Sequence, residues 1–121
     1  AGIATYLVSG VTYEGEFKEE EFHGNGIYTW PDGAKYKGEF RNGQFQGQGI
    51  ITYANGSIFS GEFQDNLFHG KGTLTYSDGT KYVGKFLDNY ITEAIFTDLD
   101  QNNFKQVWDK GKMISSLEIF K

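Results

Sequence analysis

The sequence predicts an all-β protein: an elongated, twisted single-layer antiparallel meander of β-hairpin repeats with a degenerate C-terminal cap. Two observations predict this fold. An aromatic-x-Gly-x-Phe pattern returns at a step of 23 residues, beginning at Tyr13, Tyr36, Phe59 and Tyr82. Within each copy two stretches alternate at period two, which is typical of strands, and Asp-Gly or Asn-Gly dipeptides typical of hairpin turns follow them.

The 121 residues are expected to form a single array without a second domain. Residues 1–12 are interpreted as a half repeat, with Gly2, Ala4 and Tyr6 in the columns of Gly26, Tyr28 and Trp30. The full repeats are 13–35, 36–58 and 59–81, followed by a degenerate repeat at 82–103 and a cap at 104–121. The start in mid-unit without an initiating Met indicates a trimmed piece or the end of a longer array.

Each full repeat is expected to contain two strands, the first built on Tyr13-x-Gly-x-Phe and the second on Gly-x-Gly-x-Tyr-x-Trp30, or their equivalents. The glycines of the Asp/Asn-Gly turns, such as Gly33, are expected to adopt positive φ. The other connection, residues 19–21 and equivalents, is polar and variable, so it is expected to tolerate change.

After Gly84 the pattern degenerates, because Glu93 and Ile95 stand in the glycine columns. Phe104-x-Gln106-x-Trp108 echoes the opening triplet at a step of 22. Such loss of glycine is typical of the terminal repeats of an array. Residues 115–120 are compatible with a closing strand or a short helix.

Across roughly residues 2–90 the chain resembles the MORN (membrane occupation and recognition nexus) repeat family, through its three ungapped 23-residue copies with Gly-x-Gly and Asp/Asn-Gly. The resemblance implies a single-layer sheet of consecutive hairpins. It also implies a protein-binding scaffold at cilia, cytoskeleton or membrane contacts, or an accessory part of an enzyme. The degenerate tail beyond residue 92 lies outside the family's pattern.

Alternation places the rings and glycines on one face and charged residues and threonines on the other, polar and solvated face. We expect rings to lie across glycine backbone on the neighbouring strand and let the sheet bend there. The residues with this structural role are Gly15, Gly24, Gly26, Gly38, Gly47, Gly49, Gly61, Gly70, Gly72, Gly84, Phe17, Phe40, Phe63 and Phe86.

No second layer is evident to cover the aromatic face, and a large exposed apolar patch usually marks an interaction site. We therefore expect this face to bind a helical or extended segment of a partner protein. Most rings are expected to form the core, with those at strand ends reaching the partner. The predicted contact residues are Tyr28, Trp30, Tyr36, Tyr53, Phe59, Tyr76 and Tyr82.

Catalysis and metal binding are not expected. Cys is absent, and His23 and His69 occupy the same column two repeats apart, which places them on the order of 19 Å apart at a strand spacing of about 4.8 Å. The Gly-x-Gly pairs precede strands and lack the following Lys of a phosphate loop. Glu16, Glu39 and Glu62 form a ladder on the solvated face, unlike a shielded acid-base pair. We expect no enzyme activity and no cofactor.

The net charge of −5 disfavours nucleic acid and anionic lipid as ligands and favours a partner with a basic flank. Peripheral phospholipid binding, self-association through the strand at Gly2 to Tyr6, and an accessory role in a larger enzyme remain as alternatives. The absence of Cys and of a signal peptide favours a cytoplasmic location, and the resemblance implies an association with cytoskeleton or cilium.

Overall fold

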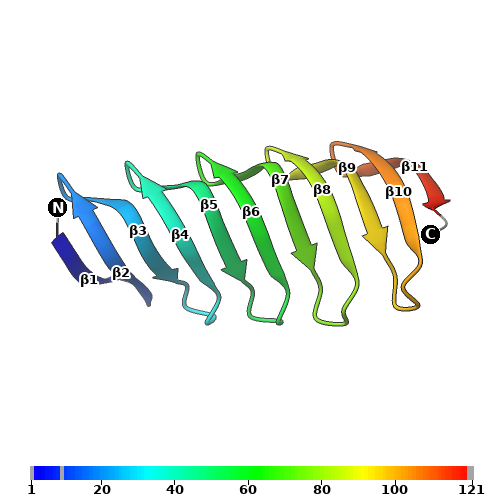
Figure 1. The fold of residues 1–121 in the computed structure, drawn as a ribbon. Helices are drawn as coiled ribbons and strands as arrows, with labels where there is room; N and C mark the ends of the chain where they lie inside the picture. The colour runs from blue at the N-terminus through cyan, green and yellow to red at the C-terminus, as the bar shows by residue number, and fades with distance from the viewer. Residues whose placement is uncertain (1, 9, 120–121) are drawn as a thin grey trace.

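The computed structural model describes residues 2–8 and 10–119, with side chains for residues 10–119, and shows one eleven-stranded antiparallel sheet. The strands are β1 (Gly2–Val8), β2 (Val11–Lys18), β3 (Glu21–Thr29), β4 (Lys35–Arg41), β5 (Gln44–Thr52), β6 (Ile58–Gln64), β7 (Leu67–Thr75), β8 (Lys81–Leu87), β9 (Tyr90–Thr97), β10 (Asn103–Asp109) and β11 (Lys112–Ile119). Their order in the sheet is their order in the chain. The strands lie side by side in a single layer with the termini at opposite ends (Figure 1), which confirms the predicted all-β meander.

A row of glycines crosses the sheet from β2 to β8. Cross-strand pairing sets each glycine opposite the next: Gly15, Gly26, Gly38, Gly49, Gly61, Gly72 and Gly84. We call this the glycine row. Paired glycine α-carbons approach closely, because a Cβ added to Gly38 would come within 2.5 Å of the α-carbon of Gly49.

Rings fill the space above the glycine row, on what we call the aromatic face. Tyr13, Tyr36 and Phe59 are 0% exposed. A Cβ on Gly49 would lie 2.5 Å from atoms of the Tyr36 ring, and one on Gly72 would lie 2.5 Å from Phe59. The predicted packing of rings across glycine backbone is therefore confirmed.

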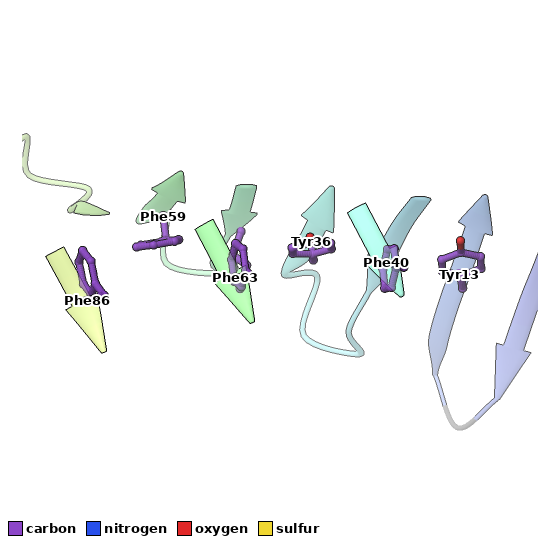
Figure 2. Close-up of a cluster of buried hydrophobic side chains, with 7 residues drawn as sticks. Tyr13, Tyr36, Phe40, Phe59, Phe63 and Phe86 are labelled. Atoms are coloured by element: carbon purple, nitrogen blue, oxygen red, sulfur yellow. The ribbon is translucent and has the colours of Figure 1, made fainter. Parts of the chain in front are cut away.

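The buried rings form a continuous ladder along the array. The Tyr36 ring stacks on Phe45 within its own repeat, with centroids 3.9 Å apart, and meets Phe63 of the next repeat edge-to-face at 5.1 Å. The equivalent pairs repeat both geometries at the same centroid distances: Tyr13 with Phe22 and Phe40, and Phe59 with Phe68 and Phe86. Successive rings alternate in orientation along the sheet (Figure 2). Each repeat is thus packed on the next one, as the array architecture requires.

A β-bulge interrupts the second strand of each full repeat. In the pair β4–β5, Gly38 faces Gly49 and Phe40 faces Phe45, so the β5 segment is longer by two residues. Gly47, within that segment, has a φ of 72°, a left-handed conformation that glycine adopts without strain. Gly24 and Gly70 occupy the same place with positive φ, so this column shapes the bulge and does not lie beneath a ring.

Glu16, Glu39 and Glu62, which we call the glutamate column, each accept a hydrogen bond from a backbone amide in one of these bulges. Glu39 Oε2 accepts a 2.7 Å hydrogen bond from the amide of Gln48, next to the bulge glycine. Glu16 and Glu62 do the same for Asn25 and Lys71, also at 2.7 Å. These glutamates were predicted to lie on a solvated face, and their hydrogen bonds to the bulges were not predicted.

The degenerate fourth repeat has a shorter bulge. Gly84 of β8 faces Ala94 of β9, not Ile95 as the alignment predicted, and Phe86 faces Ile91. One residue of the bulge has been lost. This loss accounts for the 22-residue step from Tyr82 to Phe104. The segment from residue 115, which was compatible with a strand or a short helix, belongs to strand β11.

The first strand also differs from its predicted alignment. β1 pairs Gly2 with Phe17, Ala4 with Gly15 and Tyr6 with Tyr13. These pairings place Gly2, Ala4 and Tyr6 in the columns of Gly24, Gly26 and Tyr28, two residues from the columns predicted. The shift arises because β1 ends at Val8 and β2 begins at Val11, whereas five residues separate β3 from β4.

Two kinds of turn join the strands. Gly33, Gly56 and Gly79 have φ of 94°, 92° and 97°, as expected for the Asp/Asn-Gly turns. The connections β2–β3, β4–β5, β6–β7, β8–β9 and β10–β11 are two-residue turns in which both residues have positive φ, including Glu19 at 51° and Glu20 at 68°. These values are typical of type I′ turns, which favour Asn and Gly. They restrict which residues the connection takes without strain, and its tolerance of change stays a prediction.

Candidate partner-binding surface

The floor of the aromatic face is inaccessible in the isolated chain. Tyr36 and Phe59 were predicted to contact a partner, but both side chains are fully buried. The Tyr36 hydroxyl donates a 2.7 Å hydrogen bond to the carbonyl of Glu39, and Tyr13 makes the same bond to Glu16. Phe59 lacks this hydroxyl. These side chains belong to the core, because they cover the glycine row.

The rim of the aromatic face consists of rings that keep part of their surface in solvent: Tyr28, Trp30, Tyr53, Tyr76 and Tyr82. Tyr76 is 40% exposed, and the other four are half-buried. Trp30, Tyr53 and Tyr76 follow β3, β5 and β7 at equivalent positions, so these three lie one per repeat along one end of the strands. We call these five residues the aromatic rim.

The first part of the rim forms a small depression. The ring centroids of Tyr28 and Trp30 are 5.0 Å apart, and Phe45 lies 5.9 Å from Tyr28 and 5.8 Å from Trp30. Gly43 and Asn66 complete its lining, and its volume is about 270 Å³. Because its wall combines three rings with the polar groups of two turns, it can take an apolar side chain together with a hydrogen-bonding group.

Three phenols gather on the second part of the rim. The rings of Tyr76 and Tyr82 are 6.1 Å apart. Burial raises the pKa of Tyr53 and of Tyr82, and the nearby Tyr76 adds to both shifts. At neutral pH the hydroxyls of Tyr53 and Tyr82 are therefore protonated and can donate as well as accept hydrogen bonds.

The predicted structural phenylalanines lie in the core, with one exception. Phe40, Phe63 and Phe86 are buried, and Phe17 in the first repeat is half-buried. Interior repeats are covered on both sides by their neighbours, and this coverage explains the burial of Phe40 and Phe63.

The opposite side of the sheet, which we call the second face, is less polar than predicted. Ile50, Ile58 and Val83 are exposed there at 44%, 40% and 43%. Depressions lie around Ile50 and around Val83, the latter rimmed by lysines. Period-two alternation places these aliphatic side chains on the same face as the charged residues and threonines, so the expectation of a wholly polar face is wrong.

Within residues 2–8 and 10–119, no group of three or more His, Cys, Asp or Glu side chains is arranged to hold a metal ion. His69 Nδ1 lies 3.8 Å from Asp88 Oδ1 at the surface. The same residues contain no helix of the length and hydrophobicity needed to cross a membrane.

The model of the MORN repeat family matches the sequence three times in succession, at residues 13–35, 36–58 and 59–81. Together these matches cover more than half of the chain. Repeats of this kind occur in modules that interact with proteins or membranes. No curated protein matches the chain.

Proposed function

Because the chain belongs to the MORN repeat family, we propose that it is a noncatalytic protein-binding scaffold whose aromatic face holds a helical or extended segment of a partner. The assembly it serves is ciliary, cytoskeletal or at a membrane contact, in the cytoplasm. The proposal adds to family membership a specific surface, the aromatic rim.

The observation that carries this proposal is the partial exposure of the rim above a fully buried floor. Tyr76 keeps 40% of its surface exposed although it lies beside other rings. Tyr and Trp combine a large apolar area with a polar group, and they dominate the binding energy of many protein interfaces. The one-per-repeat spacing of Trp30, Tyr53 and Tyr76 suits a partner segment that runs along the array.

The fully buried Tyr36 and Phe59 support the rim without contacting the partner in this proposal. Their burial beneath neighbouring rings explains why the surface is preformed, which lowers the entropic cost of binding. The chain's negative charge favours a partner whose flank is basic, mainly through the association rate.

Affinity capture with quantitative mass spectrometry tests the proposal. The chain with Trp30, Tyr53 and Tyr76 all changed to Ala is compared with a control in which Thr52 and Thr75 of the second face become Ala. We expect the rim variant to lose specific partners that the control retains, with both variants folded by circular dichroism. A partner set unchanged in the rim variant would refute the rim as the binding surface.

A second candidate function, self-association, is favoured by the exposed aliphatic side chains of β11. Met113, Ile114 and Leu117 are 48%, 61% and 71% exposed. In the described part of the chain β11 pairs only with β10, so its other edge is open to strand pairing. The alternative site at Gly2 to Tyr6 rests on side chains outside those described.

Light scattering over a concentration series separates this candidate from the first. Leu117→Lys, which places a charge at the most exposed of the three positions, should dissociate any dimer without changing the unfolding midpoint. A chain that is monomeric at all concentrations excludes self-association and leaves the rim proposal untouched.

A further inference from the structure

The fourth position of the glutamate column carries a positive charge in place of a negative one. Glu16, Glu39 and Glu62 are followed, one repeat later, by Lys85. A lysine side chain cannot accept a hydrogen bond from the amide of a bulge residue. The bulge on β9, the strand that pairs with Lys85, is the shortened one. Lys85 Nζ instead lies 3.5 Å from Glu93 Oε1. The charge reversal and the loss of the bulge glycine therefore occur together.

This reversal assembles three lysines on the second face. Lys71 on β7 is directly opposite Lys85 on β8, and Lys105 on β10 is directly opposite Ile95 on β9. Like charges opposite each other on neighbouring strands repel. Two carboxylates lie beside the three lysines, because Glu93 pairs with Lys85 and Glu62 accepts a hydrogen bond from the amide of Lys71. A net positive charge therefore remains at this place in a chain whose total charge is −5.

Between these lysines the sheet is hollowed and apolar. Val83 and Ile95 face each other across β8 and β9, and Gly72, Gly84 and Ala94 line the floor between them. The depression has a volume of about 420 Å³. We call it the lysine groove. Glu62 does not line it, and its carboxylate is held at the amide of Lys71 by a 2.7 Å hydrogen bond.

We propose that the lysine groove binds an acidic segment of a partner protein, in which carboxylates flank an aliphatic side chain. The carboxylates pair with Lys71 and Lys105, and the aliphatic group lies against Val83 and Ile95. Charge complementarity selects this occupant, because a bound carboxylate relieves the repulsion between Lys71 and Lys85. The proposal concerns the second face and stands independently of the aromatic rim.

The first repeats supply an internal comparison. A similar depression there is lined by Glu14, Ile27, Lys37 and Ile50, with a glutamate and a single lysine. It has the aliphatic floor without the cluster of lysines. The lysine groove is therefore a property of the last repeats and not of every repeat in the array.

Titration with a short blocked peptide, in which two glutamates flank an isoleucine–valine pair, tests the proposal by two-dimensional amide NMR. We expect shifts centred on Gly72, Val83, Gly84 and Ile95. Replacing the glutamates of the peptide by glutamine, or its aliphatic pair by serine, should each weaken binding at least about tenfold, because each removes one half of the recognition.

Lys85→Glu is the sharpest variant, because glutamate is the residue of the other three repeats at this position. It should weaken peptide binding at least about tenfold with an unchanged circular dichroism spectrum, whereas Lys37→Glu on the same face should leave binding unchanged. Equal affinity of wild type and Lys85→Glu, or shifts centred on Trp30 and Tyr53, would overturn the proposal.

A vesicle experiment distinguishes the peptide from a lipid surface. The peptide proposal expects no sedimentation of the chain with anionic phospholipid vesicles at physiological salt. Sedimentation that disappears in the Lys71→Gln, Lys85→Gln double variant, combined with no peptide binding, would assign the groove to a membrane and refute the peptide.

Discussion

The ring of Tyr36 lies across the bare backbone of Gly49 on the neighbouring strand, 2.5 Å from where a Cβ on that glycine would stand. The ring also stacks on Phe45 and donates its hydroxyl to the backbone of Glu39. One side chain thus joins two strands of its own repeat and contacts Phe63 of the next.

Gly49→Ala is expected to destabilise the array by about 1–3 kcal/mol, because a methyl group would displace a ring that is packed on all sides. Urea unfolding measures the change. Thr52→Ala, at an exposed position on the same strand, is the control and should change stability by less than about 0.5 kcal/mol. Equal stability of Gly49→Ala and wild type would show that the sheet accommodates the methyl group by bending.

Exchanging Tyr and Phe between repeats tests the hydroxyl separately from the ring. Tyr36→Phe should cost about 0.5–1.5 kcal/mol, because the carbonyl of Glu39 loses its partner. Phe59→Tyr, at the equivalent position of the third repeat, should offset the lack of that bond and stabilise by a similar amount. Thermal unfolding of both variants checks the pair, and a destabilised Phe59→Tyr would mean that the third repeat has no room for the hydroxyl.

Stability should fall at alkaline pH. Burial, together with the negative Glu39, raises the pKa of Tyr36 well above its usual range. The stabilisation that the folded state gains from the neutral Tyr36 phenol is fully present below the unfolded pKa of about 10. It is lost as the pH rises from that value toward the folded pKa. Unfolding midpoints measured across this range should decline more steeply for wild type than for Tyr36→Phe. Parallel curves would show that other groups cause the decline.

Glu20→Gly should stabilise the first hairpin by about 1 kcal/mol, because Glu20 has a φ of 68°, a conformation costly for a residue with a Cβ. Glycine already occupies the equivalent position 43 of the next repeat. Glu21→Gly, one residue later in β3, is the matched control and should destabilise. Chemical denaturation distinguishes the two signs, and destabilisation by both changes would contradict the turn assignment.

The strands, the hairpin order and the contact between rings and glycines were predictable, because identical columns in three repeats disclose both the alternation and the partner of each strand. Tyr36 and Phe59 show where that reasoning stops. A pattern of alternate residues assigns them to the aromatic face, but only the structure shows that neighbouring rings bury both completely.

The bulges were not predictable from the alternation of side chains, because a period of two residues does not indicate where a strand contains two extra residues. The same gap produced the wrong partner for Gly84, since Ala94 faces it only after one bulge residue is lost. Lys71, Lys85 and Lys105 are far apart in the sequence and converge through cross-strand pairing. The substitution of lysine for glutamate at 85 was the available signal.

The glycine row gives the array a constant spacing from one repeat to the next. The same glycine–ring contact recurs within each full repeat, between β2 and β3, β4 and β5, and β6 and β7. Each repeat therefore adds two strands, or about 9.6 Å of width, without altering its neighbours. The separation between the Trp30 depression near one end and the lysine groove near the other is therefore set by repeat number. A chain with one repeat inserted would hold two bound segments farther apart by that increment.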